Sequence, residues 1–293
     1  QKLWEADSQT KLKSILFEFE KFLAKKFNYQ PQKNYKKLFN WTIKNPKEFW
    51  SSIWEFSNIK GIKNDKYHFP KEIIKSKFLV NSKLNYAENL LSKNDNSKAI
   101  TFISENGYRE EKSWKELNIN SLKLVRVFIE NKIKEKDRLA AYTTTQIETV
   151  ERFLASSAIG AIWSSCSPDF GTQGVIERFS QIKPKLLIIT DRYCYNGKEI
   201  NVIERLPSIL KKIKSIKTVL IINYPGKKNL KQQKIKGIKI FYFNKLNYKV
   251  KNKIIFKKFD FDKELAILYS SGTTGKPKCI CHRAGGVLLQ HLK

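Results

Sequence analysis

Residue types that could do chemistry gather in one short stretch near the C-terminal end, residues 269–278, with the sequence YSSGTTGKPK. Two glycines, Gly272 and Gly275, let backbone N–H groups turn toward a common centre, and the hydroxyl side chains around them add further donors. Lys278 supplies a point charge. Glycine, hydroxyl and lysine in this spacing predict a concave, positively charged loop that holds a chain of phosphates.

This loop differs from the Walker A motif, in which a lysine followed by Ser or Thr opens a helix. Here Lys276 is followed by Pro277, so no hydroxyl stands where a magnesium ligand would be needed. The alternative is a solvated turn after a strand. Because the ten residues come directly after residues 265–268, an apolar run with the length and composition of a buried strand, we favour nucleotide phosphate binding.

The ten-residue string resembles the phosphate-binding signature of the adenylate-forming superfamily, which contains acyl-CoA synthetases, peptide-synthetase adenylation domains and luciferases. The resemblance implies that the loop holds the phosphates of ATP, that Lys278 acts in catalysis, and that the main catalytic lysine lies outside this chain. The residues that it assigns to ATP are Ser270, Ser271, Gly272, Thr273, Thr274, Gly275 and Lys278.

Several other stretches are similar to acetoacetyl-CoA synthetases within that superfamily, and the resemblance covers about residues 35–293. It implies a ligase that activates acetoacetate with ATP to an acyl-adenylate and transfers the acyl group to coenzyme A, giving acetoacetyl-CoA, AMP and pyrophosphate. The alternative within the class is a ligase for acetate or propionate. The stretches are residues 46–56, 78–91, 160–171, 175–179 and 282–293.

The resemblance also implies a coenzyme A site in the middle of the chain. Lys198 aligns with an arginine that meets the 3′-phosphate of CoA in acetyl-CoA synthetases, and Tyr195 stands where a second arginine falls. The alternative is that Lys198 is an exposed lysine opening a helix. Ser167, Pro168 and Asp169 align near the same CoA pocket.

Metal-ligating residues are few and scattered. The chain has three histidines and four cysteines, with no ligand spacing beyond one C-x-C, so we expect neither a zinc site nor a disulfide framework. We expect Mg²⁺ to arrive with ATP, held mainly by phosphates. His282, just after the loop, has either a structural or a substrate-pocket role. The cysteines, without a signal-peptide or membrane-spanning pattern, predict a cytoplasmic protein.

The net charge of +30 raises a rival from another class, a basic nucleic-acid-binding protein. Only eight of the 57 basic residues are arginine, the residue suited to bidentate recognition of bases and phosphates, and the lysines are spread along the chain. We therefore expect small-molecule substrates and no nucleic-acid partner. Salt-sensitive retention of DNA would favour the rival, and stabilisation by ATP would favour the ligase.

The pattern of apolar runs predicts an α/β fold with parallel β/α layers after an N-terminal helical extension. An amphipathic helix is expected within residues 1–30 and a second helix after Pro46, and we place the domain boundary between residues 92 and 93. From there strands alternate with helices, which favours parallel pairing with helices on both faces of a sheet. The expected strands are 99–103, 139–142, 161–164, 186–190, 219–222 and 265–268, and the expected helices 113–129, 148–159, 172–182 and 200–213.

Both ends of the chain suggest the N-terminal portion of a longer enzyme. The sequence has no methionine, and it stops fifteen residues after Lys278 within a segment that resembles the family. We therefore expect an incomplete adenylate-forming domain over residues 93–293, with the adenine contacts, the acyl pocket, the hinge and the C-terminal lid beyond it. Such a chain is expected to be inactive alone.

Overall fold

The structure is a computed structural model that describes residues 3–31, 34–227, 234–242, 255–270 and 275–293. The chain forms two compact units, residues 1–83 with 288–293, and residues 84–287. The domain boundary expected between residues 92 and 93 stays a prediction.

The first unit is mainly helical, as the sequence indicates. Its helix α4 begins at Pro46, where a residue without an N–H costs no hydrogen bond. The single amphipathic helix expected within residues 1–30 is instead two helices, because Ser14 caps the second one by accepting from the Phe17 amide at 3.2 Å. Its elements are α1 (Ser8–Leu12), α2 (Ile15–Lys26), α3 (Tyr35–Lys44), α4 (Pro46–Phe56), β1 (Gly61–Ile62) and the 3₁₀ turn η1 (Ile73–Lys75).

The apolar side chains of α2 are only partly buried. Phe19 and Leu23 are buried, but Ile15 is 77% exposed and Leu16 47% exposed. The apolar side chains are therefore buried in the middle of α2 and exposed in its first turn, which follows the break between α1 and α2.

The second unit is built on a seven-stranded sheet with the order β11-β10-β7-β5-β6-β13-β14. Neighbouring strands are parallel from β11 to β13, which confirms the expected pairing, and only the last pair, β13 and β14, is antiparallel. The strands are β5 (Arg138–Tyr142), β6 (Ile162–Cys166), β7 (Leu186–Thr190), β10 (Thr218–Ile222), β11 (Lys239–Tyr242), β13 (Glu264–Ser270) and β14 (Lys278–Arg283).

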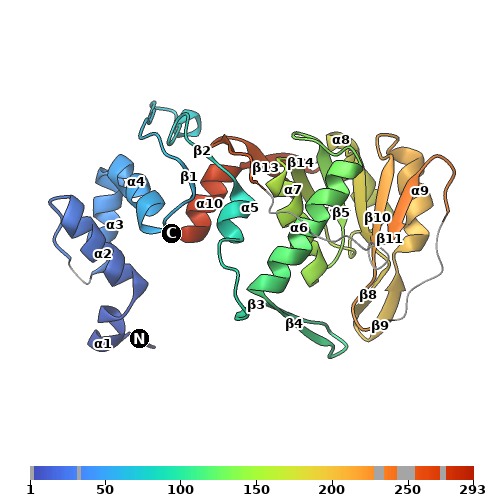
Figure 1. Cartoon of the computed structure of the whole chain (residues 1–293), viewed down its shortest axis with the longest axis horizontal. Coiled ribbons are helices and arrows are strands. Elements are labelled where there is room, and N and C mark those ends of the chain that lie inside the picture. Colours follow the sequence, from blue (N-terminus) through green and yellow to red (C-terminus); the bar gives the residue numbers. More distant parts are fainter. Residues whose placement is uncertain (1–2, 32–33, 228–233, 243–254, 271–274) are drawn as a thin grey trace. The chain divides into compact units, whose positions relative to one another are not determined.

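Helices cover both faces of this sheet (Figure 1), as expected. Ser164 on β6 lies 3.0 Å from the Tyr269 hydroxyl, and the Tyr269 ring lies 6.5 Å from the ring of Phe179 on α8. The preceding residue, Trp163, packs its ring 5.8 Å from Phe153 on α7. Successive residues of a strand face opposite ways, so α7 and α8 lie on opposite faces. The helices are α6 (Trp114–Glu130), α7 (Ile147–Ala158), α8 (Thr172–Ile182) and α9 (Leu206–Lys212).

Two local signals set the ends of the helices α6 and α7. Ser113 and Glu116 form a capping box at the start of α6, since each side chain accepts from the other's backbone amide. Gly160 follows α7 with φ +72°, and a Cβ there would meet the Phe259 ring at 2.6 Å. Both the left-handed conformation and the close ring require glycine at that position.

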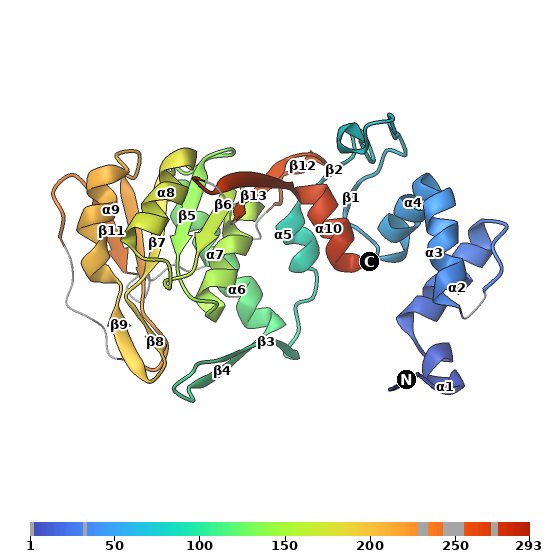
Figure 2. The ribbon, with the colours of Figure 1, turned by 180° about the vertical axis from the view of Figure 1, so that it is seen from behind.

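Two antiparallel hairpins in this unit were not predicted (Figure 2). They are β3 (Lys98–Ile103) with β4 (Arg109–Ser113), and β8 (Arg192–Tyr195) with β9 (Lys198–Asn201). The helix expected over residues 200–213 is therefore wrong at its start: β9 reaches Asn201, the 3₁₀ turn η2 (Ile203–Arg205) follows, and α9 begins at Leu206. The remaining described elements are β2 (Lys83–Leu84), α5 (Tyr86–Leu90), β12 (Phe259–Asp260) and α10 (Ala284–Leu292).

The missed hairpin of β8 and β9 does have a signal in the sequence. Asn196 and Gly197 join its strands with φ of +50° and +71°. Asn-Gly is the pair that two-residue hairpin turns favour, because both central residues need a positive φ. The polar strands on either side carry no long apolar run, so the apolar pattern alone does not mark the hairpin.

Candidate functional site

The candidate residues lie along one edge of the sheet. Parallel strands present their carboxyl ends at the same edge, which is where ligands bind in open α/β sheets. Residues 167–169 come directly after β6, and the expected phosphate loop comes directly after β13. The segment with Lys198 follows β7. The fold therefore directs all three groups of candidates toward this carboxyl edge.

The structure describes the residues on either side of the phosphate loop, up to Ser270 and from Gly275. Ser271, Gly272, Thr273 and Thr274 lie outside the described residues. Ser270, the last residue of β13, is paired with Lys278, the first residue of β14, in the antiparallel register. Gly275 has φ +110°, a conformation that favours glycine. The loop is thus closed by a hairpin that brings Ser270 and Lys278 opposite each other.

Residues of α8 and β6 hold these flanks in place. The Gln181 amide donates to the carbonyl of Pro277 at 2.9 Å, and the Cys279 thiol donates to the Gln181 side-chain oxygen at 3.7 Å. On the other flank, Tyr269 lies against Ser164, and burial raises the pKa of its hydroxyl. The strands on both sides of the loop are therefore anchored to the same layer of the fold.

The second group of candidates forms a tight turn after β6. The Ser167 hydroxyl donates to the Asp169 carboxylate at 2.6 Å, and the Phe170 amide donates to the carbonyl of Ser167 at 3.1 Å. Ser167 and Asp169 are exposed, whereas Pro168 is buried. Burial and the carboxylate of Asp169 raise the pKa of Tyr193, so this residue of β8 lies beside the turn. The turn presents a hydroxyl and a carboxylate at the carboxyl edge.

Two residues to which the sequence did not point, Tyr142 and Arg205, hold the backbone of this turn. The Tyr142 hydroxyl donates to the carbonyl of Phe170 at 2.5 Å. Arg205 Nη1 donates to the carbonyls of Pro168 at 2.8 Å and Phe170 at 3.3 Å, and also to the Tyr142 hydroxyl. Tyr142 ends β5 at the carboxyl edge, and Arg205 is among the few arginines of a lysine-rich chain; these were the only signals in the sequence.

A third residue, Arg178 on α8, joins the two groups of candidates. Its guanidinium carbon lies 4.1 Å from the centre of the Phe170 ring and 5.9 Å from that of Tyr269. Phe170 ends the turn after β6, and Tyr269 precedes the phosphate loop. A cation over two aromatic faces stabilises both contacts. The structure thus brings the turn and the flank of the phosphate loop together around Arg178.

Lys198 stands at the turn end of the hairpin of β8 and β9, opposite Tyr195 in the register. It therefore lies on a strand, and the alternative that it opens a helix is wrong. Lys198 is exposed. Within the described part of the chain it forms no ion pair, whereas the adjacent Glu199 pairs with Arg192 at 2.6 Å and Lys227 at 3.0 Å. Its charge is thus open to an anion from solution.

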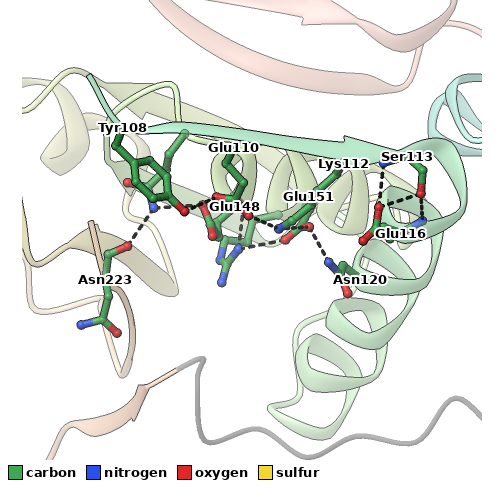
Figure 3. Close-up of polar contacts among 11 residues, drawn as sticks. Tyr108, Glu110, Lys112, Ser113, Glu116, Asn120, Glu148, Glu151 and Asn223 are labelled. Atoms are coloured by element: carbon green, nitrogen blue, oxygen red, sulfur yellow. Dashed lines mark hydrogen bonds and ion pairs between the residues drawn. The ribbon is translucent and has the colours of Figure 1, made fainter. Parts of the chain in front are cut away.

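A second polar network lies on the face of the sheet that α7 covers, opposite the face covered by α8. It joins β4 to α6 and α7 (Figure 3). Lys112 Nζ lies 3.3 Å from a Glu151 carboxylate oxygen and 3.5 Å from one of Glu110. The Asn120 amide donates to Glu151 at 2.8 Å. The Glu151 side chain is fully buried, and this burial raises its pKa. The four residues form the Lys112–Glu151 network, which is closed to solvent at its carboxylate.

Gln146, at the N-terminal end of α7, ties neighbouring strand ends together. Its side-chain amide donates to the carbonyl of Asn223 at 3.1 Å, and its side-chain oxygen accepts from the Thr144 hydroxyl at 2.9 Å. Thr144 follows β5 and Asn223 follows β10. Gln146 is fully buried, so its hydrogen bonds fix the carboxyl edge where those two strands end.

Within the described ranges, no three histidine, cysteine, aspartate or glutamate side chains are grouped so that they could hold a metal ion. His282 lies half-buried on β14. In the same part of the chain no helix is long and apolar enough to cross a membrane.

Residues 90–292, more than half of the chain, match the family described as AMP-binding enzyme. The chain belongs to the AMP-binding enzyme family. The match includes the strand-to-loop segment around Tyr269 and Lys278, the turn after β6 and the hairpin of β8 and β9. The α/β fold predicted from the sequence is the fold of this family.

Several relatives of this AMP-binding chain are described as acetoacetyl-CoA synthetases. The acetoacetyl-coenzyme A synthetase of Rhizobium meliloti (strain 1021) is 34% identical over 99% of this chain and 44% of its own length. The acetoacetyl-CoA synthetase of Gallus gallus is 37% identical over 89% and 40%. A solved acetoacetyl-CoA synthetase from Streptomyces lividans superposes with a TM-score of 0.89 at 26% identity, over 100% of this chain and 45% of that one. The chain thus spans less than half the length of these relatives.

Proposed function

We propose that this chain forms part of an acetoacetate–CoA ligase, which joins acetoacetate to ATP with release of pyrophosphate and passes the acyl group from AMP to the thiol of coenzyme A. The observation that carries the proposal is the hairpin that pairs Ser270 with Lys278 at the carboxyl edge of the sheet. The relatives described as acetoacetyl-CoA synthetases, at 34% and 37% identity, support acetoacetate over acetate or propionate.

In this proposal the loop acts by position and charge. Negative charge builds on pyrophosphate as the carboxylate attacks the α-phosphorus, and fixed donors and a cation lower the energy of that state without an enzyme nucleophile. Lys278 supplies the cation. Ser270, Gly275 and residues 271–274 supply hydroxyl and backbone donors. Mg²⁺ accompanies ATP and is held mainly by its phosphates.

Coenzyme A is proposed to bind beside the turn after β6. Ser167 and Asp169 are exposed there, and Pro168 between them in the sequence is buried. Lys198 is the cation proposed for the 3′-phosphate, since its ammonium group is exposed and unpaired within the described residues. A point charge on a flexible stem suits a terminal phosphate that needs no bidentate partner.

A cytoplasmic location is part of the same proposal. The four cysteines are free thiols, as expected in a reducing compartment. Acetoacetate, ATP and coenzyme A are small anions, and the charge of +30 favours their approach.

The test is titration of the chain with ATP and Mg²⁺ by calorimetry, together with the thermal midpoint in the same solutions. Lys278→Ala is expected to weaken ATP binding by about 10-fold or more, because a charged contact to phosphate is lost. Lys276→Ala, in the same loop but before Pro277, is the matched control and should change it little. Equal ATP binding in Lys278→Ala and the unaltered chain would remove Lys278 from the site. Salt-sensitive retention of DNA without competition by ATP would favour the nucleic-acid rival.

A further inference from the structure

The turn after β6 is held from below by two side chains that come from distant parts of the chain. Tyr142 and Arg205 are 63 residues apart, yet both reach the carbonyl of Phe170, at 2.5 Å and 3.3 Å. Both also reach the carbonyl of Pro168, at 3.2 Å and 2.8 Å. We call these contacts the Tyr142–Arg205 bracket. It grips the backbone of the turn and leaves the side chains of Ser167 and Asp169 exposed.

The bracket also connects the turn to the segment that carries Lys198. Arg205 ends the 3₁₀ turn η2, which follows β9 directly. Tyr193 on β8 lies close enough to Asp169 and Arg205 that both affect the pKa of its hydroxyl, which burial raises. The turn and the hairpin, which carry the proposed CoA contacts, therefore share Arg205 as a common anchor.

The contacts of Arg205 in the bracket all come from one nitrogen, Nη1, whose two hydrogens serve three acceptors. The acceptors here are carbonyl oxygens and a hydroxyl, which carry no net charge. Among the residues that the structure describes, Arg205 forms no ion pair, so its positive charge is not neutralised by a carboxylate. A charge kept in this way contributes a favourable potential to any anion that binds at the turn.

We propose that Arg205, supported by Tyr142, is a positioning residue that fixes the turn of residues 167–170 in the shape that receives coenzyme A. The inference rests on the proposed CoA role of Ser167, Pro168 and Asp169. A turn that is already ordered loses less conformational freedom when a ligand binds, so the bracket raises affinity without touching the ligand. The ATP loop has anchors of its own in Gln181 and Ser164, so loss of the bracket should affect it less than the turn.

The experiment measures turn order and ligand binding in the same variant, Arg205→Met. Hydrogen exchange of the Asp169 and Phe170 amides, in the absence of ligand, is expected to become about 10-fold faster because the turn loses its hydrogen bonds to Arg205. CoA affinity is expected to fall by about 5- to 20-fold, and ATP affinity to change by less than about 2-fold. Arg205→Lys, which keeps the charge but not the fixed position of Nη1 at the end of a planar group, should give an intermediate loss.

The chain offers a matched control at the other end of β5. Arg138 also donates to backbone carbonyls, those of Ile182 at 2.5 Å and Lys136 at 3.2 Å, but at the amino edge of the sheet. Arg138→Met should leave both the exchange of the turn and the ratio of CoA to ATP affinity unchanged. A general loss of stability would instead move both arginine variants alike.

Each other outcome decides against the proposal. Unchanged exchange in Arg205→Met would mean that Arg205 does not order the turn. Faster exchange with unchanged CoA affinity would mean that order in the turn does not contribute to CoA binding. Equal losses of CoA and ATP affinity would mean that the variant destabilises the whole unit. If the unaltered chain binds ATP but not CoA, the proposed CoA site fails, and the positioning role of Arg205 toward CoA fails with it, whereas faster exchange in Arg205→Met would still show that Arg205 orders the turn.

Discussion

The two polar networks of the second unit use charge in opposite ways. The Tyr142–Arg205 bracket sets one guanidinium against neutral carbonyls at the carboxyl edge of the sheet. The Lys112–Glu151 network sets an ammonium group against carboxylates under β4, on the face covered by α7 (Figure 3). The first arrangement keeps a positive charge beside an exposed turn, and the second neutralises it inside the fold. This difference separates a network suited to ligand binding from one suited to stability.

The two networks should also fail differently. A buried ion pair contributes little net stability over an apolar pair, but removing one partner leaves the other charge buried and uncompensated. A hydrogen bond to a carbonyl leaves only a polar acceptor behind. Substitutions in the Lys112–Glu151 network should therefore affect unfolding, and those in the bracket should affect the turn.

The largest effect is expected for Lys112→Met. The side chain of Glu151 is fully buried and that of Lys112 only 15% exposed, so the variant removes the ammonium partner of a buried carboxylate and leaves the Arg152 guanidinium, 3.6 Å away, as its remaining cation. The free energy of unfolding should fall by about 3–5 kcal/mol. Urea denaturation followed by circular dichroism measures it. Lys115→Met, an exposed lysine on the same stretch of chain, is the control and should change it by less than about 0.5 kcal/mol.

The double variant Lys112→Met, Glu151→Leu sharpens this test. Removing the carboxylate as well should restore part of the lost stability, because the buried carboxylate is gone while Arg152, 3.6 Å from it, keeps its hydrogen bond to the carbonyl of Glu148 at 2.7 Å. If the double variant is as unstable as the sum of the two single variants, the penalty comes from packing, and the comparison between the two networks loses its basis.

Part of the loss of unfolding free energy in Lys112→Met should disappear at lower pH. Burial raises the pKa of Glu151 in the folded chain, despite the opposing charges of Lys112 and Arg152. A carboxyl group whose pKa is raised on folding opposes folding above that pKa and ceases to do so as the pH falls through it; each pKa unit is worth about 1.4 kcal/mol. The deficit of Lys112→Met should therefore shrink as the pH is lowered toward the ordinary range of carboxyl groups, and Lys112→Met with Glu151→Leu should not show this trend. A deficit that stays constant as the pH is lowered would contradict the assignment to Glu151.

Tyr142→Phe tests the bracket, and its expected loss of unfolding free energy is smaller than that of Lys112→Met. The variant removes the hydroxyl that donates to the Phe170 carbonyl, and the expected loss is about 1–2 kcal/mol of unfolding free energy, with faster amide exchange at residues 169–171. Tyr195→Phe is the control, since Tyr195 is 60% exposed. A loss as large as that of Lys112→Met would erase the difference between the networks.

The smallest effect is expected at Lys198, which is exposed. Lys198→Ala should weaken binding of coenzyme A by about 3- to 10-fold and leave binding of its 3′-dephospho form almost unchanged, because a single solvated charge contact is lost. Calorimetric titration with both ligands measures the difference. Lys211→Ala, an exposed lysine on α9, serves as the control. Equal losses for both ligands would place Lys198 away from that phosphate.

The sequence predicted the parts of the fold that depend on local apolar pattern. The strands β7 and β10 are unbroken apolar runs, and parallel strands buried on both faces have this composition. A phosphate-binding loop was predicted around Ser270 and Lys278 because its glycine, hydroxyl and lysine residues are close together in the chain. Polar hairpins were missed, since β4 and β9 have charged residues and little alternation to mark them.

The sequence could predict only those parts of the candidate site whose residues are close together in the chain. The contact of Tyr142 with Arg205 spans 63 residues, and that of Arg178 with Tyr269 joins a helix to a strand far along the chain. No local pattern encodes such contacts, because they depend on the strand order of the sheet. The strand β14 was not predicted, because its residues 278–283 are largely polar and contain no apolar run that marks a strand.

Gly160 has a consequence for how freely this sequence can change. Its φ of +72° already disfavours other residues, and a Cβ at this position would lie 2.6 Å from the Phe259 ring, which leaves no room to adjust. Gly197 has a similar φ of +71° but nothing within 4 Å of the same position. In a library of all single substitutions, position 197 should therefore tolerate asparagine or aspartate, which adopt left-handed conformations readily, while position 160 should retain glycine alone.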